Sequence, residues 1–427
     1  MIIPTNGMEI DHDVIIKPGV YPLPDGIKIT QDNITINGNG ALFVGTGKDG
    51  NGLLIEGHSD VMVSNLHLQN YYHGIAIKDS KRLAIQGCQV TGTAEVPANT
   101  IFLDIWLPPE KAYGSGIFLW NVVDGKILSN DLQHQMNGLL AYCCDDLVIQ
   151  YNNASYCSGF GFHLYQTYNS HVENNYADYC CRYEPRGERL GHMGADSTGF
   201  LIISGSSNNT FRGNYARLDG DGFFLAGMSP QMLLAGCNNN LFEKNDGSYS
   251  PNIAFEATFS SGNIFRDNRA NFCNYGFWCG FSNSSIIENN QIHENRQAGI
   301  AVENGFDFEI KNNSFSRNEH GILLWSKQIP AFAVAVPANN TSYGWQIEDN
   351  EFDYNWKAIR IAADQDHGIR PLPPGGEFGI PAPYPHHHTI INNNIQNSNI
   401  GIELFHTEGT AFKGNHFSGN RRDIQEE

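Results

Sequence analysis

The amino-acid sequence predicts an all-β fold, a single right-handed parallel β-helix of about 13 coils with loop insertions. A small residue followed by a short apolar strand recurs along nearly the whole chain of 427 residues. Seven of the twelve spacings between these small residues, which we call anchors, are 22 to 24 residues long. A repeat of this length, built from short strands, is typical of a solenoid in which each repeat contacts only its neighbours.

The anchor is usually glycine, and apolar residues follow it at positions +1 and +3. The anchors are Gly52, Gly74, Gly116, Gly138, Gly161, Gly199, Gly222, Asn252, Gly276, Gly299, Gly321, Ala358 and Gly401. Because successive side chains of a strand point to opposite faces, positions +1 and +3 should point inward and positions +2 and +4 outward. Helical repeats are excluded, since they need a longer period and amphipathic helices.

Asparagine recurs in phase with the anchors, three residues after an apolar residue. This series is Asn130, Asn152, Asn175, Asn214, Asn245, Asn268, Asn290, Asn313, Asn350, Asn394 and Asn415. Asparagine side chains hydrogen-bond the backbone of turns, so stacked copies should form a ladder along the coil. A second series five residues later is Asn295, Asn318, Asn355 and Asn420, with Cys157, Cys180 and Cys273 in other coils. We therefore interpret these cysteines as reduced, buried ladder rungs.

The chain is expected to have three parts. Residues 1–50 should form an N-terminal cap and a first irregular coil, residues 51–420 the β-helix, and residues 421–427 a polar tail. The ends of a solenoid need such covers because an open coil exposes unpaired backbone groups. The longer insertions are residues 91–113, 178–196, 327–343 and 364–388.

Short parallel strands joined by repeated Asn turns resemble the pectate-lyase-like superfamily of carbohydrate-active β-helix proteins. The resemblance covers residues 30–420 and is architectural. That superfamily includes lyases, polygalacturonase-type hydrolases, uronan epimerases and inulin fructotransferases. The Asp-Pro-His, Arg-Ile-Lys and Gly-His-Gly elements of particular subfamilies are absent from the sequence. The resemblance therefore implies a carbohydrate substrate without selecting one reaction.

Composition and charge restrict the partners. The net charge is −19, from 45 acidic and 26 basic residues, and this argues against nucleic acid as a partner. No apolar run is long enough to cross a membrane as a helix. The N-terminus lacks a basic start followed by an apolar block, so we expect a cytoplasmic protein or a secreted one whose leader is missing from the sequence. Exposed rings could also form a homo-oligomer interface.

Outward positions carry aromatic rings and acids where an ordinary solvated sheet would carry Lys, Thr and Ser. Rings stack on the apolar faces of sugars, so we predict a sugar-binding groove on this face. The alternative is that the insertions fold over the sheet and bury the rings. The candidate substrate-binding residues on the strands are Trp120, Tyr142, Trp278, Trp325, Arg360 and Glu403.

Glu256 and Glu303 both fall at position +4, two coils apart, with Gly280 between them. Stacked strands lie about 4.8 Å apart, which places the two backbones about 9–10 Å apart. Glycosidases use two carboxyl groups, about 6.5–9.5 Å apart in inverting enzymes. The leading hypothesis is a carbohydrate-active enzyme that cleaves or transfers a glycosidic bond, as a hydrolase or an intramolecular transferase. Asp221, directly before an anchor, is a further catalytic candidate.

A second constellation suits uronan lyase or C5-epimerase chemistry, in which a base removes a proton beside a carboxylate held by a cation. His163 and Tyr165 point outward on one strand as catalytic candidates. The next insertion supplies Arg186, His192 and Asp196 as candidate substrate-binding residues. A third hypothesis is a non-catalytic sugar-binding solenoid, because a fold alone does not determine a function.

No cofactor is expected. Three consecutive histidines, His386, His387 and His388, cannot all face one metal ion in an extended chain, so we expect a surface loop there. Scattered acids could bind calcium, although the EF-hand pattern is absent.

Overall fold

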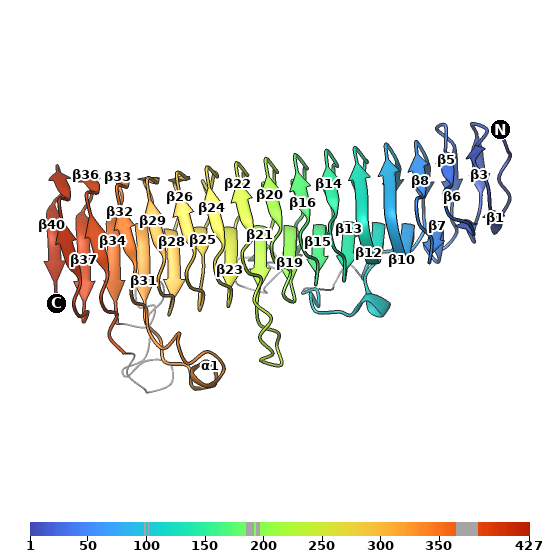
Figure 1. The fold of residues 1–427 in the computed structure, drawn as a ribbon. Coiled ribbons are helices and arrows are strands. Elements are labelled where there is room, and N and C mark those ends of the chain that lie inside the picture. The colour runs from blue at the N-terminus through green and yellow to red at the C-terminus, as the bar shows by residue number, and fades with distance from the viewer. Residues whose placement is uncertain (98–99, 101, 185–191, 194–196, 364–382) are drawn as a thin grey trace. The chain divides into compact units, whose positions relative to one another are not determined.

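The computed structural model describes residues 1–427 except 98–99, 101, 185–191, 194–196 and 364–382. The chain forms two compact units, Met1–Gly220 and Asp221–Glu427, which we call unit 1 and unit 2. Within each unit short strands pair in parallel with the strands of the next coil (Figure 1). The predicted parallel β-helix fold is therefore confirmed.

Each regular coil of unit 1 has up to three strands. The anchor strands, which contain the anchors, are β7 (Asn51–Glu56), β10 (His73–Gln86), β12 (Ser115–Leu128), β13 (Asn137–Tyr142), β15 (Phe160–Tyr165) and β19 (Thr198–Ile203). The second strands are β2 (Val14–Ile15), β5 (Thr35–Asn37), β8 (Met62–Ser64), β14 (Val148–Gln150), β16 (His171–Glu173) and β20 (Thr210–Arg212), while β10 and β12 extend into this position. The third strands are β3 (Val20–Pro22), β6 (Leu42–Val44), β9 (His67–Gln69) and β11 (Gln89–Thr91).

Unit 2 repeats this plan. Its anchor strands are β21 (Asp221–Ala226), β23 (Ile253–Thr258), β25 (Tyr275–Trp278), β28 (Ala298–Glu303), β31 (His320–Trp325), β34 (Lys357–Ala362), β37 (Ile400–Phe405) and β40 (Arg422–Glu426). The second strands are β22 (Leu241–Glu243), β24 (Ile264–Arg266), β26 (Ile286–Glu288), β29 (Glu309–Lys311), β32 (Gln346–Glu348), β35 (Thr389–Ile391) and β38 (Ala411–Lys413). The third strands are β27 (Gln291–His293), β30 (Ser314–Ser316), β33 (Glu351–Asp353), β36 (Asn394–Gln396) and β39 (His416–Ser418).

Strands pair in parallel at both ends of the chain. Within residues 1–50, β1 (Met8–Ile10) pairs with β4 (Ile27–Ile29), which pairs with β7. At the other end β40 pairs in parallel with β37, so residues 422–426 form a strand. These pairings satisfy backbone groups that a loose end would expose.

The anchors are small because the next coil touches them. A Cβ atom on Gly138 would lie 2.5 Å from the carbonyl oxygen of Gly161 in the next coil. One predicted anchor is wrong: β23 pairs with β21 so that Ile253 faces Asp221, which places Ala254, and not Asn252, beside Gly222. Every outward position assigned in this coil therefore shifts by two residues.

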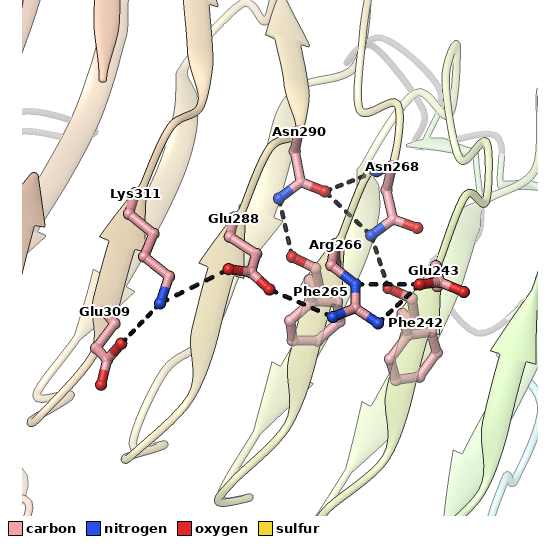
Figure 2. Close-up of polar contacts among 9 residues, drawn as sticks. All are labelled: Phe242, Glu243, Phe265, Arg266, Asn268, Glu288, Asn290, Glu309 and Lys311. Carbon is pink, nitrogen blue, oxygen red and sulfur yellow. Dashed lines mark hydrogen bonds and ion pairs between the residues drawn. The ribbon is translucent and has the colours of Figure 1, made fainter. Parts of the chain in front are cut away.

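Asparagine ladders line the interior as predicted. In unit 2 the Asn268 side-chain amide donates to Oδ1 of Asn290 at 3.0 Å (Figure 2). Asn290 in turn donates to Oδ1 of Asn313 at 3.0 Å. One rung differs from the prediction, since Asn350 donates to Asn393 and not to Asn394. The cysteines are buried rungs as expected, with Cys157, Cys180 and Cys273 each donating a weak hydrogen bond to a backbone carbonyl. All nine cysteines are free thiols.

The second strands of unit 2 carry an ordinary solvated surface. Their outward residues pair across coils with alternating charge, in the order Glu243, Arg266, Glu288 and Lys311. Arg266 lies 2.7 Å from Glu243 and 3.7 Å from Glu288, and Lys311 lies 3.6 Å from Glu288 (Figure 2). Such a ladder of partly exposed ion pairs stabilises the fold only weakly, and it offers no apolar platform for a ligand.

Candidate functional site

The outward side of the anchor strands, at positions −1, +2 and +4 from the anchor, is the candidate surface, and we call it the anchor face. The sequence left two interpretations of this face, an accessible groove and a sheet whose rings are buried, and each describes some of its coils. Trp325 is 0% exposed, while Tyr142 and His163 are 2% and 1% exposed, so these side chains are covered. Glu256 and Trp278, by contrast, are partly exposed. The anchor face is thus buried in some coils and accessible in others.

The two predicted catalytic acids do not occupy equivalent positions. Glu256 pairs with Trp278 in β25, and Trp278 pairs with Ala301 in β28. Glu303 lies two residues farther along and pairs with Trp325. The predicted equivalence is therefore wrong, because the anchor of β23 is Ala254. Two coils and a shift of two residues separate the Cα atoms by about 12 Å, with both acids still on one face.

Aromatic rings lie between and beside these acids. The ring centroids of Trp278 and Trp325 are 5.4 Å apart, and those of Trp278 and Tyr275 are 4.9 Å apart. Beside them Gly280 lacks a side chain, and a Cβ atom there would lie 3.4 Å from the Trp278 indole nitrogen and 3.9 Å from Cβ of Glu303. The structure thus brings Glu303, the edge of Trp278 and an unfilled side-chain position together.

Trp325 is the least accessible of the predicted platforms. Its indole nitrogen Nε1 is buried and has no hydrogen-bond partner among the described residues. A fully buried ring cannot stack on a substrate in this conformation, so its packing role accounts for it here. Trp120 is partly exposed, but the Lys78 ammonium lies 5.5 Å from its ring centroid and occupies one ring face.

Arg360 and Glu403, predicted to bind substrate, lie together on the anchor face of unit 2. The Glu403 carboxylate accepts hydrogen bonds from Lys357 at 2.7 Å and from Arg360 at 2.6 Å. Burial raises the pKa of Glu403, but these two cations outweigh burial and hold the pKa below its ordinary value. A cavity of about 310 Å³ is lined by Lys357, Arg360, Glu403, Leu404, Phe405, Gln425 and Glu427.

In unit 1 the structure brings His163, Tyr142 and Tyr165 together. The Tyr142 ring lies 5.2 Å from His163 and 5.2 Å from Tyr165, centroid to centroid. Both ring nitrogens of His163 are buried without a hydrogen-bond partner in the described part of the chain. Burial lowers the pKa of His163 to about 3 and raises the pKa of Tyr142. The imidazole is therefore neutral over the physiological range.

Sequence reasoning missed several neighbours of this cluster. His73 stacks on Phe118 at 4.5 Å, and the pKa of Tyr142 is also raised by Tyr72 and Tyr113. Residues 91–113 supply Tyr113, whose hydroxyl accepts a hydrogen bond from the backbone of Asp104. The sequence signal that points to His73 is its position −1, immediately before the anchor Gly74.

Arg182, from the insertion predicted to supply cations, is held by backbone carbonyls. Its guanidinium donates to Thr100 at 3.2 Å and to Ser158 at 3.1 Å. Two other predicted residues of this insertion, Arg186 and Asp196, lie outside the described residues. His192 belongs to the short strand β18 (His192–Met193), which pairs with β17 (Tyr183–Glu184).

Asp221 has a structural role that accounts for it without catalysis. It is fully buried, and its Oδ1 accepts hydrogen bonds from the side chain of Asn252 at 2.9 Å and from the backbone of Ile253 at 3.0 Å. Asn137 in unit 1 makes the same kind of bond, accepting from the backbone of Phe160. Asp221 thus lies at position −1 of the anchor face, where these hydrogen bonds fix the orientation of its carboxylate.

The three consecutive histidines differ from the expected surface loop at one position. His388 is fully buried, and burial lowers its pKa to about 3, while His386 and His387 contact each other through their Nδ1 atoms at 2.8 Å. The described residues contain no group of three or more His, Cys, Asp or Glu side chains suited to a metal ion. The described residues also contain no helix with the length and apolar character to cross a membrane.

Comparison with known proteins gives a family match. The model of the right-handed β-helix region matches residues 23–216 and 228–333, which is more than half of the chain. No curated protein sequence matches this chain significantly.

The chain also matches solved structures at low sequence identity. The A-module of the mannuronan C-5 epimerase AlgE4 of Azotobacter vinelandii is 14% identical with a TM-score of 0.44, over 97% of this chain and 89% of that chain. The catalytic domain of a GH87 α-1,3-glucanase in complex with tetrasaccharides is 10% identical with a TM-score of 0.40, over 99% and 68%. The DFA-IIIase of Arthrobacter chlorophenolicus A6 is 11% identical with a TM-score of 0.39, over 70% and 69%.

Proposed function

Taking as premise that the chain belongs to the right-handed β-helix family, we propose that it is a carbohydrate-active enzyme that cleaves or transfers a glycosidic bond. Glu256 and Glu303 are the proposed acid and base, on the anchor face of unit 2. Trp278 is the proposed platform for a sugar ring beside them. The resemblance of the sequence to carbohydrate-active β-helix proteins supports the substrate class.

One observation carries this proposal: two carboxyl side chains on one face flank a partly exposed indole and a position without a side chain. Cα atoms about 12 Å apart allow glutamate carboxyl groups to lie at the roughly 6.5–9.5 Å that suits inversion. The roughly 5 Å separation of retaining enzymes would require both side chains to lean fully toward each other. We therefore favour an inverting hydrolysis.

The two acids differ in access to water, and this difference suggests their roles. Glu303 is 8% exposed and lies beside Trp278 and Gly280, whereas Glu256 is more exposed. An inverting enzyme needs a base that can hold and activate a water molecule and an acid that protonates the leaving oxygen. We assign Glu256 as the base and Glu303 as the acid.

The first test is substitution of each acid by its amide. Loss of an acid or base should lower turnover by about 10²–10⁴-fold, so E256Q and E303Q should each lose most activity while keeping the thermal midpoint. The assay measures the reducing ends that the enzyme releases from a panel of neutral and acidic glycans. E351Q, at an exposed position on β33, is the matched control and should keep full activity. Near-normal turnover of both E256Q and E303Q would exclude this site.

A second candidate function is elimination or epimerisation at C5 of a uronate, located in unit 1. The observation that favours it is the buried, neutral His163 in contact with Tyr142 and Tyr165. A neutral imidazole or a phenol could exchange the C5 proton, and an arginine could neutralise the substrate carboxylate.

Product analysis separates the two candidates. A lyase yields a double bond conjugated to the carboxylate, which absorbs in the ultraviolet, and an epimerase changes the ratio of C5 epimers without new reducing ends. Under this second candidate Y165F should lose activity on acidic glycans, and E303Q should retain it. A protein that binds glycans without producing either change would be a sugar-binding solenoid.

A further inference from the structure

The insertion between β31 and β32, residues 326–342, is a loop with a closed base, and we call it the β31–β32 loop. Ser326 and Thr341, near its two ends, are joined by a hydroxyl–hydroxyl hydrogen bond of 2.5 Å. The Ser342 hydroxyl donates to the backbone carbonyl of Trp325 at 2.9 Å. The loop therefore leaves and re-enters the coil at nearly one point, beside the end of β31.

The base of this loop is also fastened to the preceding coil, directly after Glu303. The backbone N–H of Lys327 donates to Oδ1 of Asn304, and the Asn304 amide donates to the carbonyl of Lys327, both at 2.7 Å. The Asn339 amide donates to the carbonyl of Asn304 at 2.9 Å. Since Asn304 follows Glu303, these bonds fix the base of the loop at the end of the strand that carries the proposed acid.

The tip of the loop reaches two coils farther. It contains the helix α1 (Pro330–Ala335), drawn in Figure 1 beyond the ends of the strands. The Phe332 ring meets Phe259 at 5.1 Å and Phe281 at 4.8 Å, edge to face, and these two rings stack on each other at 5.0 Å. Phe259 directly follows Thr258, and Phe281 directly follows Gly280. The loop thus borders the strands that carry Glu256, Trp278 and Glu303.

Among the described residues, Phe332 joins the tip to the coils through its two ring contacts. The helix α1 has six residues, none of them buried, and lacks a side-chain cap at its N-terminus. Val334, two residues after the docked Phe332, is 83% exposed. An isolated helix of this length is unstable in water. Edge-to-face ring pairs contribute about 0.5–1.5 kcal/mol each beyond the burial of their area, so the two contacts of Phe332 are enough to set the position of the tip.

We infer that Phe332 is a specificity-determining residue for the proposed glycosidic reaction, because it docks the β31–β32 loop as a wall beside the candidate acids. This inference rests on the proposed function. With the wall docked, sugar units that branch toward the ends of the anchor strands would collide with the loop. The enzyme should therefore prefer linear glycans over branched ones, and release of the wall should weaken that preference.

The test compares F332A with V334A, a truncation at an exposed position on the same helix. Hydrogen exchange is followed at residues 329–338, where Val336 donates to the carbonyl of Phe332 and Ala333 donates to that of Ile329. In F332A exchange there should rise at least about tenfold, and the ratio of kcat/KM for branched to linear glycans should rise roughly tenfold. V334A should change neither quantity. F332Y keeps the ring, so it should have the exchange rate and the branched-to-linear ratio of the unmodified chain.

Two outcomes would overturn the inference. Unchanged exchange in F332A would show that the ring does not hold the tip, and faster exchange with an unchanged branched-to-linear ratio would show that the wall does not select substrates. Exchange is measured without substrate, so it is independent of the proposed reaction. If E303Q keeps its turnover, the proposed function itself fails, whatever F332A shows.

Discussion

Gly276 and Gly280 lie four residues apart in one coil, and the space around them differs. A Cβ atom on Gly276 would lie 2.6 Å from the backbone oxygen of Gly299, far inside contact distance. A Cβ atom on Gly280 would meet only the Trp278 side chain at 3.4 Å and Glu303 at 3.9 Å. A methyl group at the first position would push two coils apart, whereas at the second it would occupy the space beside the proposed acid.

These contacts predict that two alanine substitutions affect different properties, one the stability and the other the binding of substrate. G276A should lower the free energy of unfolding by about 1–3 kcal/mol, the usual cost of overpacking. G280A should leave the free energy of unfolding within about 0.5 kcal/mol and raise KM for the cleaved glycan several-fold. Denaturant titration and steady-state kinetics measure the two quantities. If G280A were as unstable as G276A, or if it bound substrate normally, the assignment of Gly280 to the site would be wrong.

At the scale of single residues, the sequence predicts the inward positions well and one outward register poorly. The segment around Asn252 is NIAFEAT, and apolar residues occupy alternate positions whether Asn252 or Ala254 is the anchor. A strand pattern of period two cannot reveal a shift by two residues, because the same side chains stay inward. Glu256 was therefore predicted on the correct face but at position +4, whereas the structure places it at position +2.

At the scale of one structural element, the asparagine ladder connects each coil to the next through buried amides. Asn290 is 1% exposed, accepts from the backbone and side chain of Asn268, and donates to the carbonyl of Phe265 and to Asn313. The residue before each rung is the one with a left-handed backbone, as at Asn289 with φ of 57°. The rungs are thus selected for hydrogen bonding and not for conformation.

Removal of one rung should destabilise the coil strongly. N290A leaves two donors of Asn268 and one carbonyl without partners, and each buried unsatisfied group costs about 1–3 kcal/mol. We expect a loss of about 3–5 kcal/mol in the free energy of unfolding. Q291A, at the exposed neighbouring position, should change it by less than about 0.5 kcal/mol. Equal stability of the two variants would mean that the ladder only accompanies the fold.

The strands were predictable and the coverage of their outer face was not. Strand positions follow from a period that every coil repeats, and the charged rows of the second strands follow the same period (Figure 2). The path of an insertion is set by contacts with no period, such as Phe332 on Phe259 and Phe281. For this reason the sequence located Trp325 on the outward face but could not show that it is fully buried.

At the scale of the whole molecule, both units contain buried imidazoles that stay neutral when folded. Burial lowers the pKa of His163 in unit 1 to about 3, and the pKa of His320 and His388 in unit 2 to about 4 and about 3. An unfolded histidine has a pKa of about 6.5. The unfolded chain therefore binds protons more readily than the folded chain. The free energy of unfolding is unaffected by these groups above about pH 6.5 and decreases as the pH falls from there toward their folded pKa values.

This linkage predicts acid unfolding at mildly acidic pH in both units. Each buried histidine adds a slope of about 1.4 kcal/mol per pH unit between about pH 6.5 and its folded pKa. His163 lies among Phe160, Tyr142 and Tyr165, so H163F should fit and should reduce the slope by about one proton, moving the acid midpoint of unit 1 downward. Circular dichroism along a pH titration measures that midpoint. H171F, at an exposed position of β16, is the control and should leave the midpoint in place.

If H163F unfolded at the same pH as the unmodified chain, a protonated His163 would have to be tolerated inside the fold. The imidazole would then have a proton acceptor within reach, which would change the chemistry available to the candidate site in unit 1.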